Sequence, residues 1–356
     1  MNYLEKYGIT DRFKNEAAAY PKLSLARVAA QHRGLYKIVT ESGELQAEIS
    51  GKLRFETNEL AKFPTVGDYV MISSENSGSN AIIHHVLTRK SIFLRTAVGV
   101  SGQAQPVAAN IDIVFICMSL NNNFNLSRLE RYLSVAWDSG ATPVILLTKS
   151  DLCEDLERVL LEVERVSSFT EVIPLSMFDD DLVTKLSLYL KSGMTAAFIG
   201  SSGVGKSTLI NKLLGEQELA TSEVGKGDKG RHTTTGREMF LSPFGVVLID
   251  TPGMRELGAE SVDLSKSFED IETLAGQCKF NNCTHTNEPG CAILQALDDG
   301  SLDQRRFSSY LKLRIEAGYD GLSAKEIENK KLERMLKDVG GMKNFRKYVK
   351  EKRKQR

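Results

Sequence analysis

One stretch of the sequence carries the residue types of a phosphate-binding loop. It matches the pattern G-x-x-x-x-G-K-[ST] and runs Gly200-Ser201-Ser202-Gly203-Val204-Gly205-Lys206-Ser207-Thr208. Glycines let consecutive backbone N–H groups turn towards phosphate oxygens, Lys206 neutralises the β- and γ-phosphates, and the Ser207 hydroxyl ligates Mg²⁺. The apolar run 195–199 precedes the loop and the amphipathic stretch 208–214 follows it, as a strand and a helix should. The pattern therefore predicts a site for a nucleoside triphosphate with Mg²⁺.

A second motif predicts the base of this nucleotide. It follows the apolar run 143–147 and reads Thr148-Lys149-Ser150-Asp151. A carboxylate accepts two hydrogen bonds from guanine, whereas adenine would leave Asp151 unpaired at a cost of about 1–3 kcal/mol. Lys149 can pack along the base, and Ser176-Met177, after the next apolar run, can place the Met177 N–H on guanine O6. We therefore predict that the site binds GTP and GDP.

Two more motifs follow the phosphate loop. An apolar run, 246–249, ends in Asp250-Thr251-Pro252-Gly253, where Asp250 suits Mg²⁺ and the Gly253 N–H suits the γ-phosphate. The motif Arg231-His232-Thr233-Thr234-Thr235 lies in a glycine-rich stretch, 225–236, that we predict to be a mobile loop. Met254 occupies the position where many GTPases carry a glutamine that orients water. Because a thioether cannot polarise water, we expect slow intrinsic hydrolysis.

The order of these motifs differs from that of an ordinary GTPase. There the base motif follows the phosphate loop and the D-x-x-G motif, but here it precedes both, and no second [NT]-K-x-D lies downstream. The same sheet can form if the chain is cut at one loop and rejoined at another. Apolar runs alternate with helical stretches over residues 110–265. We therefore predict a circularly permuted α/β P-loop GTPase domain with a doubly wound sheet.

A cysteine-rich segment has the spacing of a metal site. Three of the five cysteines fall within the range 278–291, and five are too few for a disulfide scaffold in a chain of this size. Three sulfurs and one imidazole suit a closed tetrahedral Zn²⁺ site, which would be structural because no ligand position stays open. Unmetallated cysteines beside a surface histidine are the alternative. We predict one Zn²⁺ per chain in a helical module, 266–318, with the ligands Cys278, Cys283, His285 and Cys291.

The segment before the GTPase domain has a different pattern. Residues 1–22 are predicted to be a helical N-terminal extension, and residues 23–95 contain about five short β-like runs separated by turn signals. This pattern predicts a small closed barrel of the OB or SH3-like type. Its basic residues could contact RNA phosphates or simply line a solvated surface: Arg27, His32, Arg33, Lys37, Lys52 and Arg54. Residues 96–109, rich in Gly, Ser, Gln and Ala, are predicted to be a linker.

Composition limits the possible partners. The 356 residues include 46 Lys+Arg and 46 Asp+Glu, so only local patches can attract a polyanion. No apolar run approaches the roughly 20 residues of a membrane span, and the N-terminus lacks a signal peptide's pattern, so we expect a cytoplasmic protein. The basic helical tail, 319–356, ends in a segment, 343–356, with eight Lys/Arg and one Glu. Such a tail commonly binds nucleic acid, although a solvated helix end is the alternative.

Together these features resemble the family of ribosome small-subunit-dependent GTPase A (RsgA). The resemblance covers residues 23–318 and rests on the order barrel, T-K-S-D, P-L-S-M, G-S-S-G-V-G-K-S, R-H-T-T-T, D-T-P-G-M and C-x₄-C-x-H-x₅-C. One departure is Ser176-Met177, where Ser-Ala is usual; it is harmless if only the backbone N–H is used. The resemblance implies an OB barrel, a GTPase domain and a zinc domain.

The resemblance also implies partners and catalytic residues. It implies a factor that binds the 30S ribosomal subunit and 16S rRNA late in assembly, with GTP hydrolysis stimulated by the subunit, and we expect a monomer. The implied catalytic residues are Lys206, His232 and Thr234; alternatively, His232 only positions its loop or touches RNA. Two other functions stay open. One is a permuted GTPase that acts on the large ribosomal subunit, and the other is an RNA-binding scaffold that senses GTP without significant turnover.

Overall fold

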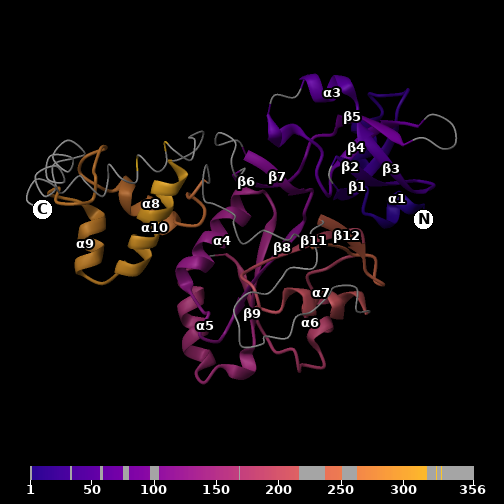
Figure 1. The fold of residues 1–356 in the computed structure, drawn as a ribbon. Coiled ribbons are helices and arrows are strands. Elements are labelled where there is room, and N and C mark those ends of the chain that lie inside the picture. Colours follow the sequence, from indigo (N-terminus) through magenta and orange to yellow (C-terminus); the bar gives the residue numbers. More distant parts are fainter. Residues whose placement is uncertain are drawn as a thin grey trace, which may run out of the picture.

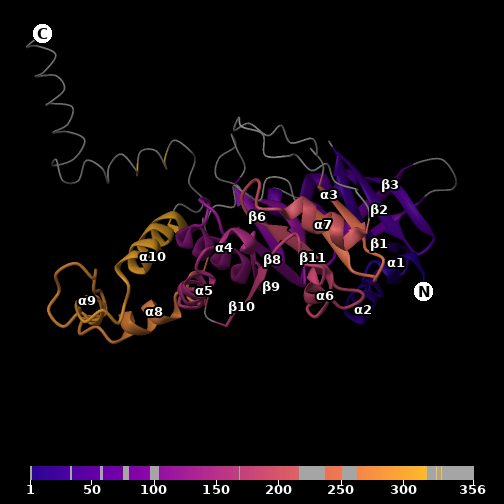
Figure 2. The same ribbon diagram turned by 90° about the horizontal axis from the view of Figure 1, so that it is seen from below.

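The computed structural model of the chain describes most of its residues. The described ranges are 2–32, 34–56, 59–74, 80–96, 104–167, 169–215, 237–250 and 263–318, together with Glu326 and Lys330. Figure 1 shows three bodies in a row: an N-terminal barrel, a central α/β sheet and a C-terminal group of helices. The barrel and the C-terminal helices lie on opposite sides of the central sheet in both ribbon views (Figures 1 and 2).

Two short helices, α1 (Tyr3–Lys6) and α2 (Asp11–Ala17), precede the barrel and confirm the predicted helical N-terminus. Helix α1 starts with a capping box, in which the side chains of Asn2 and Glu5 each accept from the other's backbone N–H. In α2 the buried Phe13 stacks on Tyr69 with 4.0 Å between ring centroids. The N-terminal helices therefore pack on the barrel.

Five strands form the predicted closed barrel. They are β1 (Ser24–His32), β2 (Leu35–Thr40), β3 (Gly43–Ile49), β4 (Tyr69–Ser73) and β5 (Ala81–Val86). Their order is β1-β2-β3-β5-β4, and β4 pairs back with β1, so the sheet closes. Alternating apolar side chains fill the interior, among them Val28, Ile38 and Ile83, which are fully buried. A short helix, α3 (Gly51–Glu56), and a 3₁₀ turn, η1 (Leu60–Lys62), lie between β3 and β4.

The central sheet has the predicted permuted GTPase topology. Its strands, in spatial order, are β10 (Glu171–Leu175), β9 (Thr142–Thr148), β8 (Ile113–Ser119), β11 (Thr195–Ile199), β13 (Val247–Asp250) and β12 (Arg237–Leu241). All neighbours are parallel except β12, which runs antiparallel to β13. Helices α4 (Leu126–Asp138) and α5 (Leu156–Glu164) pack into the core of one face, and α6 (Leu182–Ser187) and α7 (Lys206–Leu214) into the other. The sheet is therefore doubly wound (Figure 1).

Strand β12, which the sequence did not predict, joins the barrel to the central sheet. It pairs with β1 in the register Ala30↔Glu238 and Gln31↔Arg237, so that one sheet of eleven strands runs through both bodies. Lys37 of β2 supports the junction through ion pairs to Glu44 at 3.0 Å and Glu238 at 3.7 Å. The barrel is therefore attached to the strand next to β13, which carries Asp250.

Part of the predicted linker 96–109 is a strand instead. Ala104–Ala109 forms β7, which pairs with β6 (Ile92–Thr96) in a two-stranded antiparallel sheet. Val107, Ala108 and Ala109 are buried against both the barrel and the GTPase domain. Small residues fit this crowded position, and their composition resembles that of a flexible linker when only the sequence is read.

Arg27 is not available for RNA, which corrects one of the candidate phosphate contacts. Its side chain is 1% exposed, and its guanidinium donates to the carbonyls of Tyr7, Gly67 and Asn110 and, at 2.9 Å, to the Thr195 hydroxyl. These acceptors belong to the N-terminal extension, the barrel, the segment after β7 and strand β11. Because the buried Arg27 guanidinium is hydrogen-bonded to all four segments, it connects the barrel to the GTPase domain and has a structural role.

Three helices form the C-terminal module: α8 (Glu269–Gly276), α9 (Ala292–Asp298) and α10 (Gln304–Ala317). Helix α10, in the helical module predicted over 266–318, packs on α4 of the GTPase domain (Figure 2). Polar contacts connect the two helices: Ser127 and Ser309 hydroxyls at 2.8 Å, Glu130 with Arg305 and Arg306, and Arg131 with Glu316 at 2.7 Å. The module is therefore held on the same helix whose first turn lies beside the phosphate loop.

Candidate nucleotide and metal sites

The phosphate loop leaves the carboxyl end of β11 and enters α7, as predicted. Gly200 has φ +147°, and a Cβ there would lie 2.4 Å from the Cys117 carbonyl oxygen, so only glycine fits beside β8. The Lys206 ammonium folds back over the loop and donates to the carbonyls of Gly200 and Ser201, both at 2.7 Å. This arrangement places the ammonium and the N-terminus of α7 at one concave turn, where both favour an anion.

Buried groups at the ends of β8 and β9 pack against the phosphate loop and fix its position. Burial raises the pKa of the Cys117 thiol to about 12, so this cysteine is a neutral packing residue. Thr148, at the end of β9, donates its hydroxyl to the Val204 carbonyl at 2.7 Å, and both residues are buried. This hydrogen bond connects the base motif directly to the phosphate loop.

The structure brings together the two halves of the base site, which lie far apart in the sequence. Lys149 adopts the left-handed conformation at φ +57°, and Ser150 and Asp151 begin the 3₁₀ turn η2 (Ser150–Leu152). Asp151 accepts a hydrogen bond at 2.7 Å from the hydroxyl of Ser176, which follows β10. Parallel strands end at the same edge of a sheet, so the ends of β9 and β10 meet here.

Met177 lies between the base motif and the phosphate loop. Its carbonyl accepts from the Lys212 ammonium at 2.5 Å, and its terminal methyl lies 3.1 Å from the position of a Cβ on Gly205. The methionine side chain at this position therefore packs over Gly205 of the loop.

The remaining predicted nucleotide residues divide into two groups. Ser207 and Thr208 lie in the first turn of α7, and Asp250 ends β13, which is parallel to β11 in the register Ala197↔Ile249. Asp250 is therefore at the same sheet edge as the phosphate loop. Gly253, His232 and Thr234 lie outside the described residues, as does the predicted mobile loop 225–236.

One residue beside the loop was missed by the sequence analysis. Arg128, in the first turn of α4, donates to the Ser201 hydroxyl at 3.4 Å. Nothing in the local sequence separates this arginine from the other charged residues of the helix, because its position depends on how α4 packs on β8 and β9. The contact brings α4 and the phosphate loop together.

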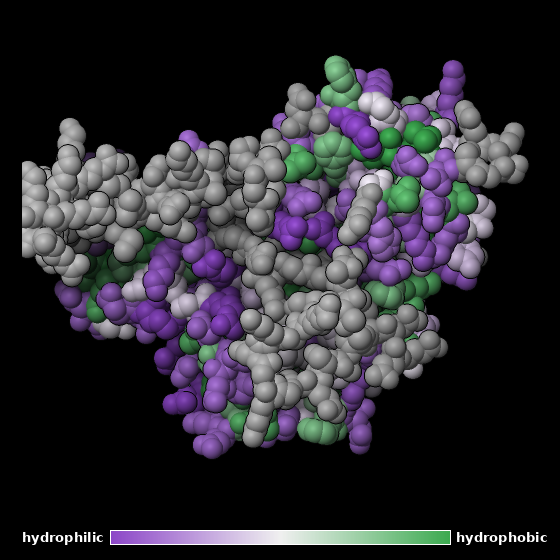
Figure 3. Space-filling model, in the orientation of Figure 1, coloured by the Kyte–Doolittle hydropathy of each residue, from purple (hydrophilic) through white to green (hydrophobic). Residues whose placement is uncertain are grey.

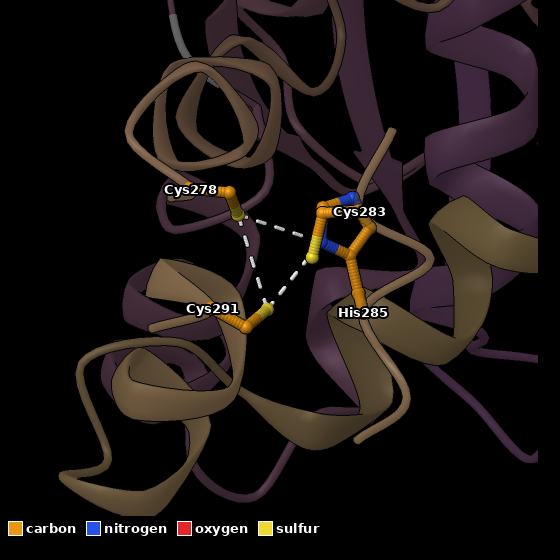
Figure 4. A group of neighbouring side chains, drawn as sticks. All are labelled: Cys278, Cys283, His285 and Cys291. Atoms are coloured by element: carbon orange, nitrogen blue, oxygen red, sulfur yellow. Dashed lines mark hydrogen bonds between the residues drawn. The ribbon is translucent and has the colours of Figure 1, made fainter. Parts of the chain in front are cut away.

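The predicted metal ligands converge in the C-terminal module. The ligand atoms of Cys278, Cys283, His285 and Cys291 all lie within 4.8 Å of one another (Figure 4). The Cys278 Sγ lies 3.9 Å from the Cys291 Sγ and 3.6 Å from the His285 Nδ1, and the Cys291 Sγ lies 3.5 Å from the same nitrogen. His285 reaches this position with φ +59°, and burial lowers its pKa, which favours the neutral imidazole. The cluster could hold a metal ion.

The fold and the site define the class of this protein. The phosphate loop, the base motif and the end of β13, which carries Asp250, meet at one edge of the sheet. The strands of this sheet follow one another in permuted order, so the protein is a circularly permuted P-loop GTPase. Two solved structures share the fold. YjeQ from Thermotoga maritima has a TM-score of 0.61 at 24% identity, with 83% of this chain and 98% of that chain covered. YloQ, described as a circularly permuted GTPase, has a TM-score of 0.58 at 25% identity, with 83% of this chain and 95% of that chain covered.

Sequence comparison gives the family. The family model described as RsgA GTPase matches residues 86–260. Small ribosomal subunit biogenesis GTPase RsgA 2 of Lactiplantibacillus plantarum is 46% identical over 344 residues, which cover 96% of this chain and 97% of the relative. RsgA of Methanosarcina acetivorans is 43% identical over 338 residues, covering 93% and 90%. The chain belongs to the RsgA family and is a GTP hydrolase. None of the helices in the described ranges is long and apolar enough to cross a membrane.

Proposed function

We propose that this chain binds the 30S ribosomal subunit, assists its late maturation and hydrolyses GTP faster when the subunit is bound. The observation that carries the proposal is the relatives' name, small ribosomal subunit biogenesis GTPase, at 40–46% identity over most of the chain. The placement of two further bodies on opposite sides of the GTPase sheet supports it (Figure 1). The protein would act in the cytoplasm, where the subunits are assembled, and would contact 16S rRNA.

The predicted residues of the nucleotide site are each assigned a role in this proposal. Asp151 recognises guanine, Lys149 packs along the base, and the Met177 N–H meets guanine O6. The loop from Gly200 to Gly205 cradles the phosphates with its backbone N–H groups, and Lys206 neutralises the charge that develops on them. Ser207 and Asp250 hold Mg²⁺, and Gly253 contacts the γ-phosphate. Mg²⁺ supplies charge neutralisation of the phosphates when it is bound with GTP.

The metal of the cysteine cluster is proposed to be Zn²⁺ in a structural role. Tetrahedral Zn²⁺ with bonds of about 2.3 Å to sulfur and about 2.0 Å to nitrogen requires sulfur atoms about 3.8 Å apart and sulfur–nitrogen distances of about 3.5 Å. In the structure the two sulfurs of Cys278 and Cys291 are 3.9 Å apart, and they lie 3.6 Å and 3.5 Å, respectively, from the His285 Nδ1. Four protein ligands would leave no position for a substrate, so the ion would hold the turn-rich segment 278–291 together.

A comparison of turnover rates tests the proposed function. GTP hydrolysis is measured with isolated 30S subunits, with 50S subunits and without RNA. We expect clear stimulation by 30S subunits alone. Stimulation by 50S subunits instead would indicate a factor of the large subunit, and no turnover even at saturating 30S would indicate a GTP-sensing scaffold.

We predict that nucleotide state and 30S binding are coupled. If the 30S subunit favours the GTP-bound state, linkage requires that GTP tighten 30S binding by the same factor. The chain should bind 30S more tightly with a non-hydrolysable GTP analogue than with GDP, as measured by equilibrium sedimentation. His232→Ala should sharply lower 30S-stimulated turnover at unchanged GTP affinity. Equal 30S affinity in both states would contradict the coupling, whereas undiminished stimulation in the variant would exclude only the histidine.

We predict that Asp151→Asn changes the base preference. Loss of the carboxylate should weaken GTP binding by about 1–3 kcal/mol, or roughly 5- to 150-fold, because an amide donor then faces a guanine donor. Xanthine offers a carbonyl at that position, so xanthosine triphosphate should bind the variant better than it binds the wild type. Asp180→Asn, an exposed carboxylate nearby, is the matched control. Unchanged GTP affinity in a binding titration would exclude Asp151 as the base reader.

We predict one zinc ion per chain in freshly purified protein, measured by elemental analysis. Cys278→Ser should lose the ion because three ligands hold Zn²⁺ much less tightly than four, whereas Cys153→Ser, outside the cluster, should keep it. Loss of the ion should loosen the C-terminal module and weaken 30S binding more than GTP binding. Protein without stoichiometric zinc would contradict the assignment.

A further inference from the structure

Helix α3 projects an aromatic side chain from one end of the barrel. Phe55 is 88% exposed, and no residue of the helix is buried. The helix is nevertheless fixed. Leu53 packs on the barrel core, the Ser50 hydroxyl accepts from the Leu53 N–H at 3.1 Å, and the Ser50 N–H donates to the Ile83 carbonyl at 2.9 Å. The Phe55 side chain is therefore exposed to solvent on a helix that is fixed to the barrel.

The charges around Phe55 distinguish it from the other highly exposed phenylalanines. Phe178 is 84% exposed and precedes three carboxylates, Asp179, Asp180 and Asp181, which repel a polyanion. Phe169 is 88% exposed and is followed two residues later by Glu171. Phe55 instead lies on a short helix that carries two cations, Lys52 and Arg54, and one carboxylate, Glu56, so the charge around it is net positive.

The side chains of Lys52 and Arg54 are both available to bind a ligand. Arg54 is exposed and forms no ion pair with any residue that the structure describes. Lys52 lies 3.8 Å from Glu56, with exposed fractions of 73% and 60%, and such a solvated pair is worth only about 0–1 kcal/mol. By contrast, Lys37 on the barrel wall is engaged by Glu44 and Glu238. Unlike Arg27 and Lys37, Lys52 and Arg54 are therefore free to meet phosphates.

The surface favours a nucleic acid over a protein partner. Exposed apolar patches larger than several hundred Å² mark protein-binding sites, but Phe55 is the one exposed large apolar residue of α3. Figure 3 shows only small hydrophobic areas among hydrophilic residues on this part of the barrel. An unpaired base offers a flat face to a single aromatic ring, and its phosphates offer charge to adjacent cations.

We propose that α3 is a binding site for single-stranded RNA, in which Phe55 stacks on an unpaired base while Lys52 and Arg54 contact the flanking phosphates. The proposal deepens the proposed function, because it rests on the chain binding ribosomal RNA and names the chemistry of one contact. The site lies on the helix at the barrel end and does not use the barrel strands.

A tryptophan placed at this position reports stacking directly. The F55W variant of the full chain is titrated with a single-stranded RNA 12-mer, and the wild-type signal, which arises from the only tryptophan, Trp137, is subtracted. We expect quenching of the added fluorescence by the single strand and much less by its duplex. Absence of quenching at RNA concentrations that saturate binding would overturn the proposal. This arm does not require ribosomal subunits.

Binding to 30S subunits tests the site in its proposed context. F55A should weaken 30S binding about 5- to 150-fold, as expected for one stacked base. F55L should be as weak as F55A because it keeps apolarity but cannot stack, whereas F55W should stay near wild type. F169A, which removes an equally exposed ring, should have no effect. Full affinity of F55L would indicate an apolar protein contact and contradict stacking. A wild type that does not bind 30S would refute the proposed function, while the quenching arm would still decide the RNA site.

Discussion

Lys206→Ala should abolish most GTP binding and turnover while the fold stays intact. In the structure the Lys206 ammonium lies over the phosphate loop and donates to the carbonyls of Gly200 and Ser201. With GTP bound, phosphate oxygens would accept these hydrogen bonds instead. Removing one partner of a desolvated charge contact costs about 2–5 kcal/mol, or roughly 30- to 4,000-fold in affinity. Hydrolysis should fall further, because the charge that develops on the transferring phosphoryl group would also lose the Lys206 ammonium.

A matched control separates this effect from general damage. Lys191→Ala removes an exposed lysine of the same domain and should leave GTP·Mg²⁺ affinity unchanged. Calorimetric titration gives the affinity, and thermal unfolding without nucleotide gives the stability of both variants. Lys206→Ala with wild-type turnover would mean that the phosphate site lies elsewhere. A large loss of stability without nucleotide would mean that Lys206 is structural.

Motifs whose chemistry is local could be predicted from the sequence. The phosphate loop needs glycine at Gly200 because its neighbour Cys117 leaves no room for a Cβ, and this requirement is visible as a spaced pattern. The metal cluster is local in the same sense, since its four ligands lie within residues 278–291. Apolar runs predicted the buried parallel strands, because such strands are apolar on both faces.

Features that depend on distant partners could not be predicted. Arg27 occupies an apolar strand, but its acceptors come from four segments as far away as Thr195, so its burial has no local signal. Strand β12 is half-buried and polar at its start, and it becomes a strand by pairing with both β1 and β13. In the same way, the composition of residues 96–109 predicts a linker, although Ala104–Ala109 is a strand at a crowded junction that requires small side chains.

The second large effect is expected at the joint between α4 and the C-terminal module. Glu130 is 1% exposed and bonds Arg306, also buried, at 3.1 Å and Arg305 at 3.0 Å. Arg306 also binds Asp270 at 2.6 Å and lies 4.8 Å over the Phe268 ring. Burial alone would lower the pKa of Arg306, but the hydrogen bonds and charges of Asp270 and Glu130 outweigh it and raise the pKa. The guanidinium therefore stays charged and depends on its carboxylates.

Glu130→Ala should lower the free energy of unfolding by about 3 kcal/mol, because the buried Arg306 keeps Asp270 but loses its other carboxylate, and Arg305 loses its shorter ion pair. Glu316→Ala is the matched control: it breaks the Arg131–Glu316 pair between the same two helices, but exposed fractions of 34% and 29% limit the expected cost to about 0–1 kcal/mol. Urea unfolding measures the stability of both variants. Hydrogen exchange of α10 under native conditions measures local loosening of the C-terminal module, which should appear first in that helix. Equal costs for the two variants would show that burial adds nothing to the pair. A large cost confined to Glu130→Ala, with faster exchange in α10, would show that this buried carboxylate of α4 holds the C-terminal module on the GTPase domain. Glu130 lies two residues after Arg128, which contacts the phosphate loop.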